Sequence, residues 1–369
     1  MKNIDRVLVK YNERLVGYLQ ILENNRIGFQ YDEEWVKNGF SISPFSLPLS
    51  DDVYISKSPY FKGLYGVFND SLPDGWGEFL VRRMLAKKGI NFEKLTPLER
   101  LTLIGSNGLG GLTYEPIQRE YVKNDNMDLD NLALNTKKIL ESKTENENLD
   151  DLFNFGGASG GARPKVHISF NDEEWIVKFG ALNDSLDVGF DEYIANKKAS
   201  EASINVNEFK LFESNRCKGY FGAKRFDRKN KQKVHVISLS AILETTHQIP
   251  NMDYYHLFQV IQKISIDKMD LYEAFRRMSF NVLYGNRDDH GKNFSFLYDE
   301  ELKGYRLTPA YDITKTDYKL EHEMTVNGNS KPNESDLLSI ADEFRLSRKI
   351  CEGIIERIKN IIVNEKDRI

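Results

Sequence analysis

Residues 285–294 read GNRDDHGKNF and place two adjacent carboxylates, a histidine, a lysine and an amide between two apolar runs. Asp288 and Asn293 are separated by four residues, so one loop can aim both side chains at a single point. A carboxylate can take the proton of an attacking hydroxyl, and an amide oxygen is a good ligand for Mg²⁺. Asp312, in TPAYDIT, follows an expected strand and would be the natural second Mg²⁺ ligand.

Two other interpretations of this stretch stay open. An ordinary polar turn between a helix and a strand uses the same kinds of residue. A zinc site built on His290 is poorly supported, because no second histidine or cysteine lies at ligand spacing.

A glycine-rich loop, FGGASGGARPK, occupies residues 155–165. Glycine lets backbone N–H groups approach an anion, so such loops can cradle phosphates. A flexible turn explains the same composition equally well. Ser159 at the tip could touch a phosphate or be phosphorylated itself.

Lys178 lies inside an apolar strand, WIVKF, seventeen residues after Gly161. Alternate side chains of a half-buried strand face the same side, so Ile176 and Lys178 share one face while Trp175, Val177 and Phe179 share the other. A lysine in this setting either faces solvent at an edge or points into a cleft. Lys165, at the end of the glycine loop, poses the same choice.

The bulk composition indicates a folded protein with large cores. The chain has 369 residues, of which 40% are hydrophobic and 12% aromatic, and this length suggests two or three packed units. The net charge of −5 shows no global basic footprint of a nucleic-acid binder. Cys217 and Cys351 form no CxxC pair, which fits a reducing cytosol. We expect a cytoplasmic protein, since the sequence shows no signal core and no apolar run long enough to span a membrane.

The hydrophobic pattern changes from strands to helices along the chain. Residues 6–31 predict antiparallel strands with tight turns, and residues 68–89 predict a helix with Asp74 near its start and Gly89 as its C-terminal cap. VHISF and EWIVKFG predict a hairpin across Asn171 and Asp172. Further strands are expected in NEFKLFE, YFGAKRFDR, FSFLY and GYRLT, and helices near 132–140, 191–203, 237–245, 253–265, 268–284, 334–342 and 346–364.

These patterns predict an α+β protein with four parts: an N-terminal α+β subdomain (1–105), a linker with one helix (106–150), a strand-rich lobe with the glycine loop (151–230), and a helical lobe with the GNRDDHGKNF loop (231–369). A glycine loop, a strand lysine, Asp-x4-Asn and a later aspartate follow one another in the order found in protein-kinase phosphoryl transfer. However, NRDDH replaces HRD, YDI replaces DFG, and the glycine spacing is not GxGxxG. The expected fold is therefore two-lobed and protein-kinase-like, but not that of an ordinary eukaryotic-type kinase.

The sequence resembles the HipA family of serine/threonine kinase toxins from bacterial toxin–antitoxin modules. The stretches that carry the resemblance are GGASGGARPK (156–165), KRFDR (224–228), NRDDHGKNFSF (286–296) and LTPAYDI (307–313). GFQYDEEW (28–35), SLPLS (46–50) and FNDSLPDGWGE (68–78) resemble the family's leading subdomain, so the match runs over nearly the whole chain.

The resemblance implies a role for each matching residue in the helical lobe. Asp288 would be the catalytic base, and Asn293 and Asp312 would hold Mg²⁺. His290 and Lys292 would belong to the catalytic loop.

It also implies an ATP site in the strand-rich lobe. Lys178 would contact the ATP phosphates, and Lys165 would be a further loop lysine. Lys224, Phe226 and Asp227 would lie in a segment that links the lobes, where the backbone meets adenine and the acid meets ribose. The loop residues expected to cover the phosphates are Gly157, Ser159, Gly160 and Gly161.

One position departs from the family pattern. HipA-type kinases often phosphorylate a serine of their own glycine loop, seven residues before the loop lysine, and this switches the kinase off. Ala158 occupies that position here, next to Ser159. Either Ser159 substitutes as the autophosphorylation site, or this chain lacks the switch.

The leading interpretation is an ATP- and Mg²⁺-dependent serine/threonine protein kinase that acts as a growth-inhibiting toxin. The family implies a protein target in translation, such as an aminoacyl-tRNA synthetase. It also implies neutralisation by a small helix-turn-helix antitoxin, and contact with DNA only indirectly through that antitoxin. A small-molecule kinase on the same scaffold is a second reading. An inactive co-repressor partner of a DNA-binding protein is a third, against which the intact Lys178, Asp288, Asn293 and Asp312 argue.

Overall fold

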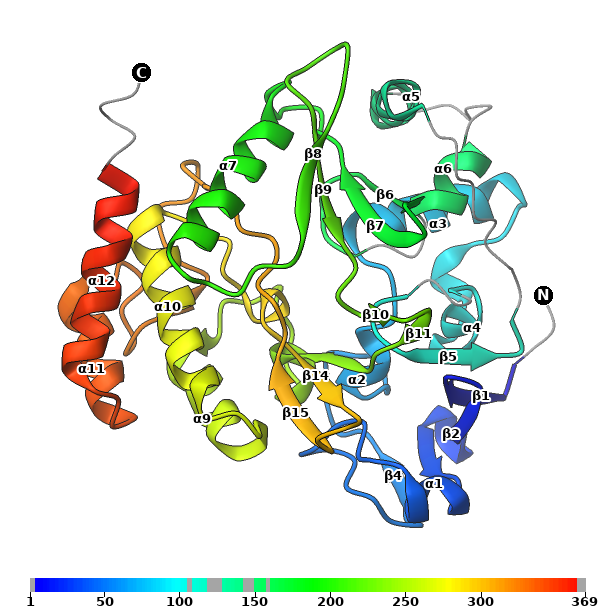
Figure 1. The fold of residues 1–369 in the computed structure, drawn as a ribbon. Helices are drawn as coiled ribbons and strands as arrows, with labels where there is room; N and C mark the ends of the chain where they lie inside the picture. Colours follow the sequence, from blue (N-terminus) through cyan, green and yellow to red (C-terminus); the bar gives the residue numbers. More distant parts are fainter. Residues whose placement is uncertain (1–3, 105–107, 118–127, 142–148, 157–159, 364–369) are drawn as a thin grey trace. The chain divides into compact units, whose positions relative to one another are not determined.

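The chain divides into two compact units in the computed structural model, whose elements are labelled in Figure 1. The structure describes residues 4–104, 108–117, 128–141, 149–156 and 160–363. Unit 1 comprises Met1–Gly189, Lys210–Ile237 and Ala241–Thr245, and unit 2 comprises Phe190–Phe209, Ser238–Ser240 and Thr246–Ile369. A mixed α+β fold is confirmed. The four-part division is finer than these two units and stays a prediction.

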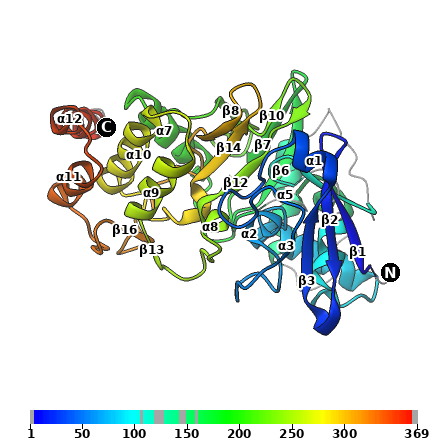
Figure 2. The same cartoon turned by 90° about the horizontal axis from the view of Figure 1, so that it is seen from below.

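Unit 1 begins with an antiparallel sheet in the strand order β4-β3-β2-β1-β5, and Figure 2 shows β1, β2 and β3 side by side. Asn12 and Glu13, with φ of 45° and 64°, make the tight turn between the first two strands, as the YNE sequence predicts. The strands are β1 (Arg6–Tyr11), β2 (Arg14–Ile21), β3 (Ile27–Tyr31), β4 (Val53–Ile55) and β5 (Leu112–Glu115).

The predicted helix after Asp74 is α3 (Gly75–Lys87). Gly89, two residues beyond the end of the helix, has a left-handed φ of +71°. Gly89 donates its N–H to the carbonyl of Ala86, and Ile90 donates to that of Leu85, both at 2.9 Å. This paired closure is a Schellman motif and explains why a glycine follows the helix. The other helices of unit 1 are α1 (Glu33–Asn38), α2 (Gly66–Asn69), α4 (Pro97–Thr102), α5 (Leu129–Glu141) and α6 (Leu149–Gly156), with 3-10 turns η1 (Glu23–Asn25) and η2 (Phe92–Lys94).

A second sheet of unit 1 has the order β6-β7-β9-β8. The predicted hairpin is its first pair, and Asn171 and Asp172 form the turn with φ of 53° and 61°, a type I′ geometry that suits the twist of the strands. The strands are β6 (Lys165–Phe170), β7 (Glu173–Lys178), β8 (Phe209–Phe212) and β9 (Tyr220–Lys224), followed by the short pair β10 (Arg228–Lys229) and β11 (Gln232–Lys233).

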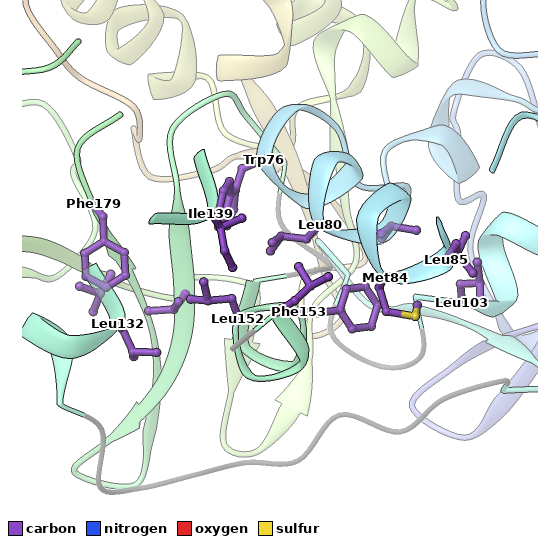
Figure 3. Close-up of a cluster of buried hydrophobic side chains, with 14 of the residues drawn as sticks. Trp76, Leu80, Met84, Leu85, Leu103, Leu132, Ile139, Leu152, Phe153 and Phe179 are labelled. Atoms are coloured by element: carbon purple, nitrogen blue, oxygen red, sulfur yellow. The ribbon is translucent and has the colours of Figure 1, made fainter. Parts of the chain in front are cut away.

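One face of this sheet is covered by a large apolar core (Figure 3). Trp76, Leu80 and Met84 from α3 and Leu152 and Phe153 from α6 contribute to it. Within WIVKF, three alternate side chains are buried in this core, namely Trp175, Val177 and Phe179. The two-face interpretation of WIVKF is therefore confirmed, and Lys178 faces away from the core.

Unit 2 is mostly helical. The expected helices appear, but the one expected over 237–245 is only the single turn α8 (Leu239–Ile242), because residues 236–238 form a strand instead. The helices are α7 (Val188–Glu201), α9 (Tyr254–Ile264), α10 (Met269–Tyr284), α11 (Glu334–Glu343) and α12 (Arg348–Val363). The strands are β13 (Met252–Asp253), β14 (Ser295–Asp299), β15 (Gly304–Leu307) and β16 (Met324–Thr325), and η3 (Gly291–Asn293) is a 3-10 turn. The strand β12 (Val236–Ser238) and the turn α8 each have residues in both units.

The core of unit 2 joins its three longest helices to the segment after Asp312. Ala195 and Ala199 of α7 pack with Phe280 of α10, Ile358 of α12 and Ile313. Small alanines let the helices approach closely. No helix in the described part of the chain is both long and apolar enough to cross a membrane.

Candidate functional site

The GNRDDHGKNF loop starts directly after the last residue of α10, at the glycine that caps this helix. Gly285 caps the helix with φ of +85°, and the N–H groups of Gly285 and Asn286 both donate to the carbonyl of Asn281 at 3.0 Å. A left-handed residue ends a helix within one position, so the chain leaves α10 and runs directly into the loop. The buried core of α10 thus fixes the start of the loop.

Asp288 and Asn293 are joined through the loop itself. The side-chain Nδ2 of Asn293 donates to the backbone carbonyl of Asp288 at 2.7 Å. This bond uses the nitrogen end of the amide and leaves Oδ1 as its acceptor end, the kind of oxygen that Mg²⁺ binds. The carboxylate of Asp288 is 40% exposed. The four-residue spacing therefore closes a compact loop with a carboxylate at one end and an amide oxygen at the other.

Asp312 has an uncommon backbone conformation. Its φ is +53°, a left-handed geometry that aspartate tolerates better than most residues and that often marks a functional position. The preceding residue, Tyr311, donates its hydroxyl to the carbonyl of Lys292 at 2.6 Å and shares a second hydrogen bond of 2.6 Å with Ser295. Tyr311, which precedes Asp312, is therefore hydrogen-bonded to Lys292, which precedes Asn293. Sequence reasoning missed this tyrosine, although it directly precedes Asp312.

The adjacent carboxylates of the loop have separate environments. Asp289 is buried, with 1% of its surface exposed. It accepts hydrogen bonds from the Tyr254 hydroxyl at 2.8 Å, His322 Nδ1 at 2.7 Å and the Glu323 N–H at 3.0 Å. Burial and the charge of Asp289 raise the pKa of Tyr254 well above its ordinary value. Asp289 therefore anchors the loop, and Asp288 is the more exposed of the two carboxylates.

Lys319 is a second residue that sequence reasoning missed. Its Nζ lies 2.5 Å from Oδ1 of Asp288 and 2.6 Å from Oε1 of Glu323. Burial acts to lower the pKa of Lys319, but hydrogen bonds to the two carboxylates outweigh it and raise that pKa. The only signal in the sequence is the charged run KTDYKLEHE after Asp312.

The other two loop candidates have structural contacts. The rings of His290 and His247 lie 5.0 Å apart between centroids. Lys292 contributes its backbone carbonyl to the Tyr311 bond, and its side chain is half-buried. A catalytic role for either side chain stays a prediction.

The described part of the glycine loop is built onto the start of α3, within unit 1. Gly161 has a φ of +84°, and its N–H donates to the carboxylate of Asp74. Trp76 donates its backbone N–H to the Gly161 carbonyl at 2.9 Å and its indole N–H to the Lys165 carbonyl at 3.2 Å. Gly160 and Gly161 are exposed. The candidates Gly157 and Ser159, together with Ala158, lie outside the described residues.

Lys165 and Lys178 occupy directly opposite positions of the β6–β7 pair. Opposite residues of an antiparallel pair point to the same face of the sheet. Lys178 Nζ lies 5.6 Å from the centre of the Phe221 ring, while Lys165 is 8% exposed. The two lysine side chains therefore lie on the face of the sheet opposite the apolar core, and Lys165 is buried there.

The KRFDR segment lies within the part of unit 1 that runs from Lys210 to Ile237. A role as the link between two lobes stays a prediction. Asp227 is 2% exposed, and its carboxylate accepts hydrogen bonds from Arg225, Arg228 and the Gly110 N–H. Burial opposes ionisation of Asp227, but the two guanidinium groups hold its pKa well below the ordinary value.

Asp227 is thus an internal brace of unit 1, meaning a buried carboxylate paired with Arg225 and Arg228, rather than an exposed acid. Lys224 forms a 3.0 Å ion pair with Glu173 on the neighbouring strands, and Phe226 is half-buried. An ATP-binding role for Lys224 and Phe226 remains untested.

Taken separately, unit 1 carries a glycine loop with two lysines and unit 2 carries an Asp-x4-Asn loop with a later aspartate, the parts of a kinase-like protein. The chain matches the HipA-like C-terminal domain over residues 157–365 and the HipA N-terminal domain over residues 7–115. It belongs to the HipA family.

Individual relatives agree with this assignment at low identity. The serine/threonine-protein kinase toxin HipA of Shewanella oneidensis is 22% identical over 370 aligned positions, covering 89% of this chain and 80% of that protein. The Sinorhizobium fredii protein Y4dM is 26% identical over 219 residues, and the match spans only 53% of either protein.

A solved structure shows the same fold. A chain of the HipA, HipB and operator DNA complex from the S. oneidensis toxin–antitoxin system superposes with a TM-score of 0.72 at 19% identity, covering 96% of this chain and 88% of that one.

Proposed function

We propose that this protein is an ATP- and Mg²⁺-dependent kinase that transfers the γ-phosphoryl group of ATP to a serine or threonine hydroxyl of a protein. The observation that carries the proposal is the bond between the Asn293 amide and the Asp288 carbonyl. It turns the Asp-x4-Asn loop into a carboxylate and an amide oxygen held at a fixed spacing, which is what a base and a metal ligand require.

The donor set in unit 2 fits Mg²⁺. Asn293 offers an amide oxygen and Asp312 a carboxylate, both hard oxygen ligands of the kind Mg²⁺ takes together with substrate phosphates and water. The left-handed backbone of Asp312, and the hydrogen bond from its neighbour Tyr311 to the Lys292 carbonyl next to Asn293, support this donor set. Bound there, Mg²⁺ would neutralise charge that develops on the phosphate oxygens.

Asp288 is the candidate base of the transfer. Its carboxylate would hydrogen-bond the acceptor hydroxyl and take its proton as the oxygen attacks phosphorus. Its partial exposure lets a substrate hydroxyl approach, whereas the buried Asp289 has no such access.

In unit 1, the two lysines of the β6–β7 pair would bind the ATP phosphates, and the N–H groups of the glycine loop would complete the phosphate contacts. Autophosphorylation of Ser159 remains part of the proposal as the candidate loop switch.

The physiological role that we propose is that of a toxin held in check by a small DNA-binding antitoxin. The S. oneidensis toxin–antitoxin complex of HipA, HipB and operator DNA supports this partner class. The net charge of −5 fits contact with DNA mainly through the partner. The proposed target is a protein of translation, such as an aminoacyl-tRNA synthetase.

Phosphoproteomics of cells that express the wild-type chain or Asp288→Asn tests the proposal. We expect serine or threonine sites that appear only with the wild-type chain, and a loss of transfer of about 10²–10⁴-fold in the variant, the usual contribution of a general base. ATP binding should be retained, because Asp288 contacts the acceptor hydroxyl rather than the nucleotide.

Equal phosphoproteomes at equal expression would contradict a protein kinase and favour a small-molecule kinase or a binding partner. The same data would report phosphorylation of Ser159.

A further inference from the structure

Lys319 occupies a position that the proposed roles leave unexplained. Its ammonium lies between two carboxylates, Asp288 and Glu323, at 2.5 and 2.6 Å. One of these is the candidate base. Its side chain is 24% exposed, so the charge is only partly screened by water. A cation within hydrogen-bonding distance of the base is close to whatever group the base acts on.

The segment that carries Lys319 is fastened to the catalytic loop on both sides. Before it, the Thr316 N–H donates to the Gly285 carbonyl at 3.1 Å, and the Arg287 N–H donates to the Thr316 hydroxyl at 2.6 Å. After it, the Glu323 N–H donates to the buried Asp289 carboxylate at 3.0 Å. The place of Lys319 is therefore set by the backbone and not only by its own ion pairs.

A comparison within the same segment shows that this is not an ordinary surface ion pair. Lys331 and Glu321 lie 3.4 Å apart, with 64% and 57% of their side chains exposed, and such pairs contribute little. Lys319 is less exposed, makes shorter contacts and is shared by two anions. Its raised pKa, due to those hydrogen bonds against the effect of burial, keeps it charged at neutral pH.

We infer that Lys319 is a further catalytic residue of the transfer proposed above. Its ammonium would bind the oxygens of the phosphoryl group while that group is being transferred. The inference rests on that proposed function. In the transfer, the acceptor oxygen forms a bond to the γ-phosphorus, the bond from phosphorus to the bridging oxygen of ADP breaks, and the hydroxyl proton passes to Asp288. A hydroxyl bonded to Asp288 therefore places the phosphoryl oxygens within reach of Lys319.

The proton transfer itself would strengthen this contact. Asp288 loses its negative charge when it takes the hydroxyl proton, so its attraction for Lys319 falls as charge builds on the phosphoryl oxygens and the leaving group. A cation that interacts more strongly with the transition state than with the ground state accelerates the reaction. Glu323 would hold Lys319 in place while its contact with Asp288 weakens and its contact with the phosphoryl oxygens strengthens. Glu323 is therefore a positioning residue.

The test compares Lys319→Met, which keeps the length of the side chain, with Lys319→Arg, which keeps its charge. Each variant, the wild type and Asp288→Asn are assayed for transfer of label from [γ-³²P]ATP into protein of a cell extract, over a range of ATP concentrations. Lys331→Met is the matched control from the exposed pair. Thermal unfolding of each purified variant shows whether it is folded.

We expect Lys319→Met to lower kcat by about 10²–10³-fold, the range for removal of one transition-state donor, with a change in KM for ATP of less than about threefold. Lys319→Arg should recover most of the loss, Glu323→Gln should cause a smaller loss, and Lys331→Met should behave as wild type.

A wild-type or higher rate in folded Lys319→Met would overturn the inference, since the lysine would then have no effect on the transfer or would slow it by pairing with Asp288. Equal losses in the Met and Arg variants would overturn it as well, because they indicate a purely structural role. Absence of transfer in folded wild-type protein that binds ATP would instead contradict the proposed function.

Discussion

Lys165 and Lys178 face one another across the antiparallel pair β6–β7, with no residue offset between them. Side chains at such positions have Cβ atoms only about 4.5–5.5 Å apart, and like charges there are destabilising. Both side chains lie on the face of the sheet opposite the core, so one anion, such as a phosphate of ATP, could contact both ammonium groups.

The lysine pair gives the first prediction. Lys178→Met and Lys165→Met should each weaken ATP binding by about tenfold or more, because a hydrogen bond to a charged group contributes about 1.5–3 kcal/mol. Calorimetric titration with ATP measures the affinity, and thermal unfolding shows whether each variant is folded.

The control for this pair is Lys210→Met, a lysine of β8 whose Nζ lies 4.0 Å from the centre of the Phe170 ring. Its ATP affinity should be unchanged. Unaltered affinity in both Lys178→Met and Lys165→Met would argue against phosphate binding at this strand pair.

The bond between Asp74 and the Gly161 N–H gives a second prediction. The carboxylate occupies a donor of the glycine loop and places a negative charge beside it. Asp74→Asn should therefore tighten ATP binding by about fivefold, in line with roughly 1 kcal/mol for a unit charge near the phosphates in water. Glu78→Gln, which removes an acid from the first turn of the same helix, is the matched control.

Fluorescence titration with a labelled ATP analogue at low and moderate salt measures this effect. The gain should shrink as salt rises, because screening weakens the repulsion. Weaker binding by Asp74→Asn would show that the carboxylate organises the loop rather than competes with phosphate.

Tyr311 gives a third prediction. Tyr311→Phe removes the hydroxyl that bonds Lys292 and Ser295, and with it the fastening between the residues next to Asp312 and Asn293. Loss of a group that orients metal ligands commonly weakens metal binding 10–100-fold, so we expect the Mg²⁺ concentration for half-maximal activity to rise by about tenfold.

A Mg²⁺ titration of phosphoryl transfer at saturating ATP checks the Tyr311 prediction. Tyr255→Phe, a tyrosine of α9 packed on Phe344, should leave the Mg²⁺ requirement unchanged. If Tyr311→Phe lowers the rate equally at all Mg²⁺ concentrations, the fastening does not act through the metal.

A fourth prediction concerns the stability of unit 1 in acid. His235 is fully buried, and burial lowers its pKa to about 4, against the opposing hydrogen bond to the Ile42 carbonyl. The unfolded chain, with a histidine pKa near 6.5, binds more protons between these values. Stability from this group is present above pH 6.5 and is lost as pH falls through 4, by up to about 3 kcal/mol.

Urea unfolding between pH 4 and pH 7 measures this dependence. His235→Gln should be less stable than wild type at pH 7 but should lose less stability on acidification. The half-buried His167, whose pKa is also held well below its ordinary value by desolvation and the charge of Arg225, should leave part of the slope in place. An identical slope in both proteins would contradict the assignment to His235.

Local sequence predicted the features that depend on near neighbours. The turn at Asn171 and Asp172 fixes the register of the hairpin, so it also fixes the pairing of Lys165 with Lys178. The alternation in WIVKF gave the two faces of the strand, and Gly89 marked the end of α3. Asp288, Asn293 and Asp312 were proposed as site residues from their spacing and order along the chain.

Only the tertiary structure decided which charged groups meet. Asp74 and Gly161 are 87 residues apart, and Lys319 lies 31 residues beyond Asp288. It also separated Asp288 from Asp289, which are equivalent in sequence, and showed that Asp227 is an internal brace. Spacing determines local geometry because the backbone has few conformations per residue. Burial and long-range partners depend on how distant elements pack, and that is not encoded in any short stretch of the chain.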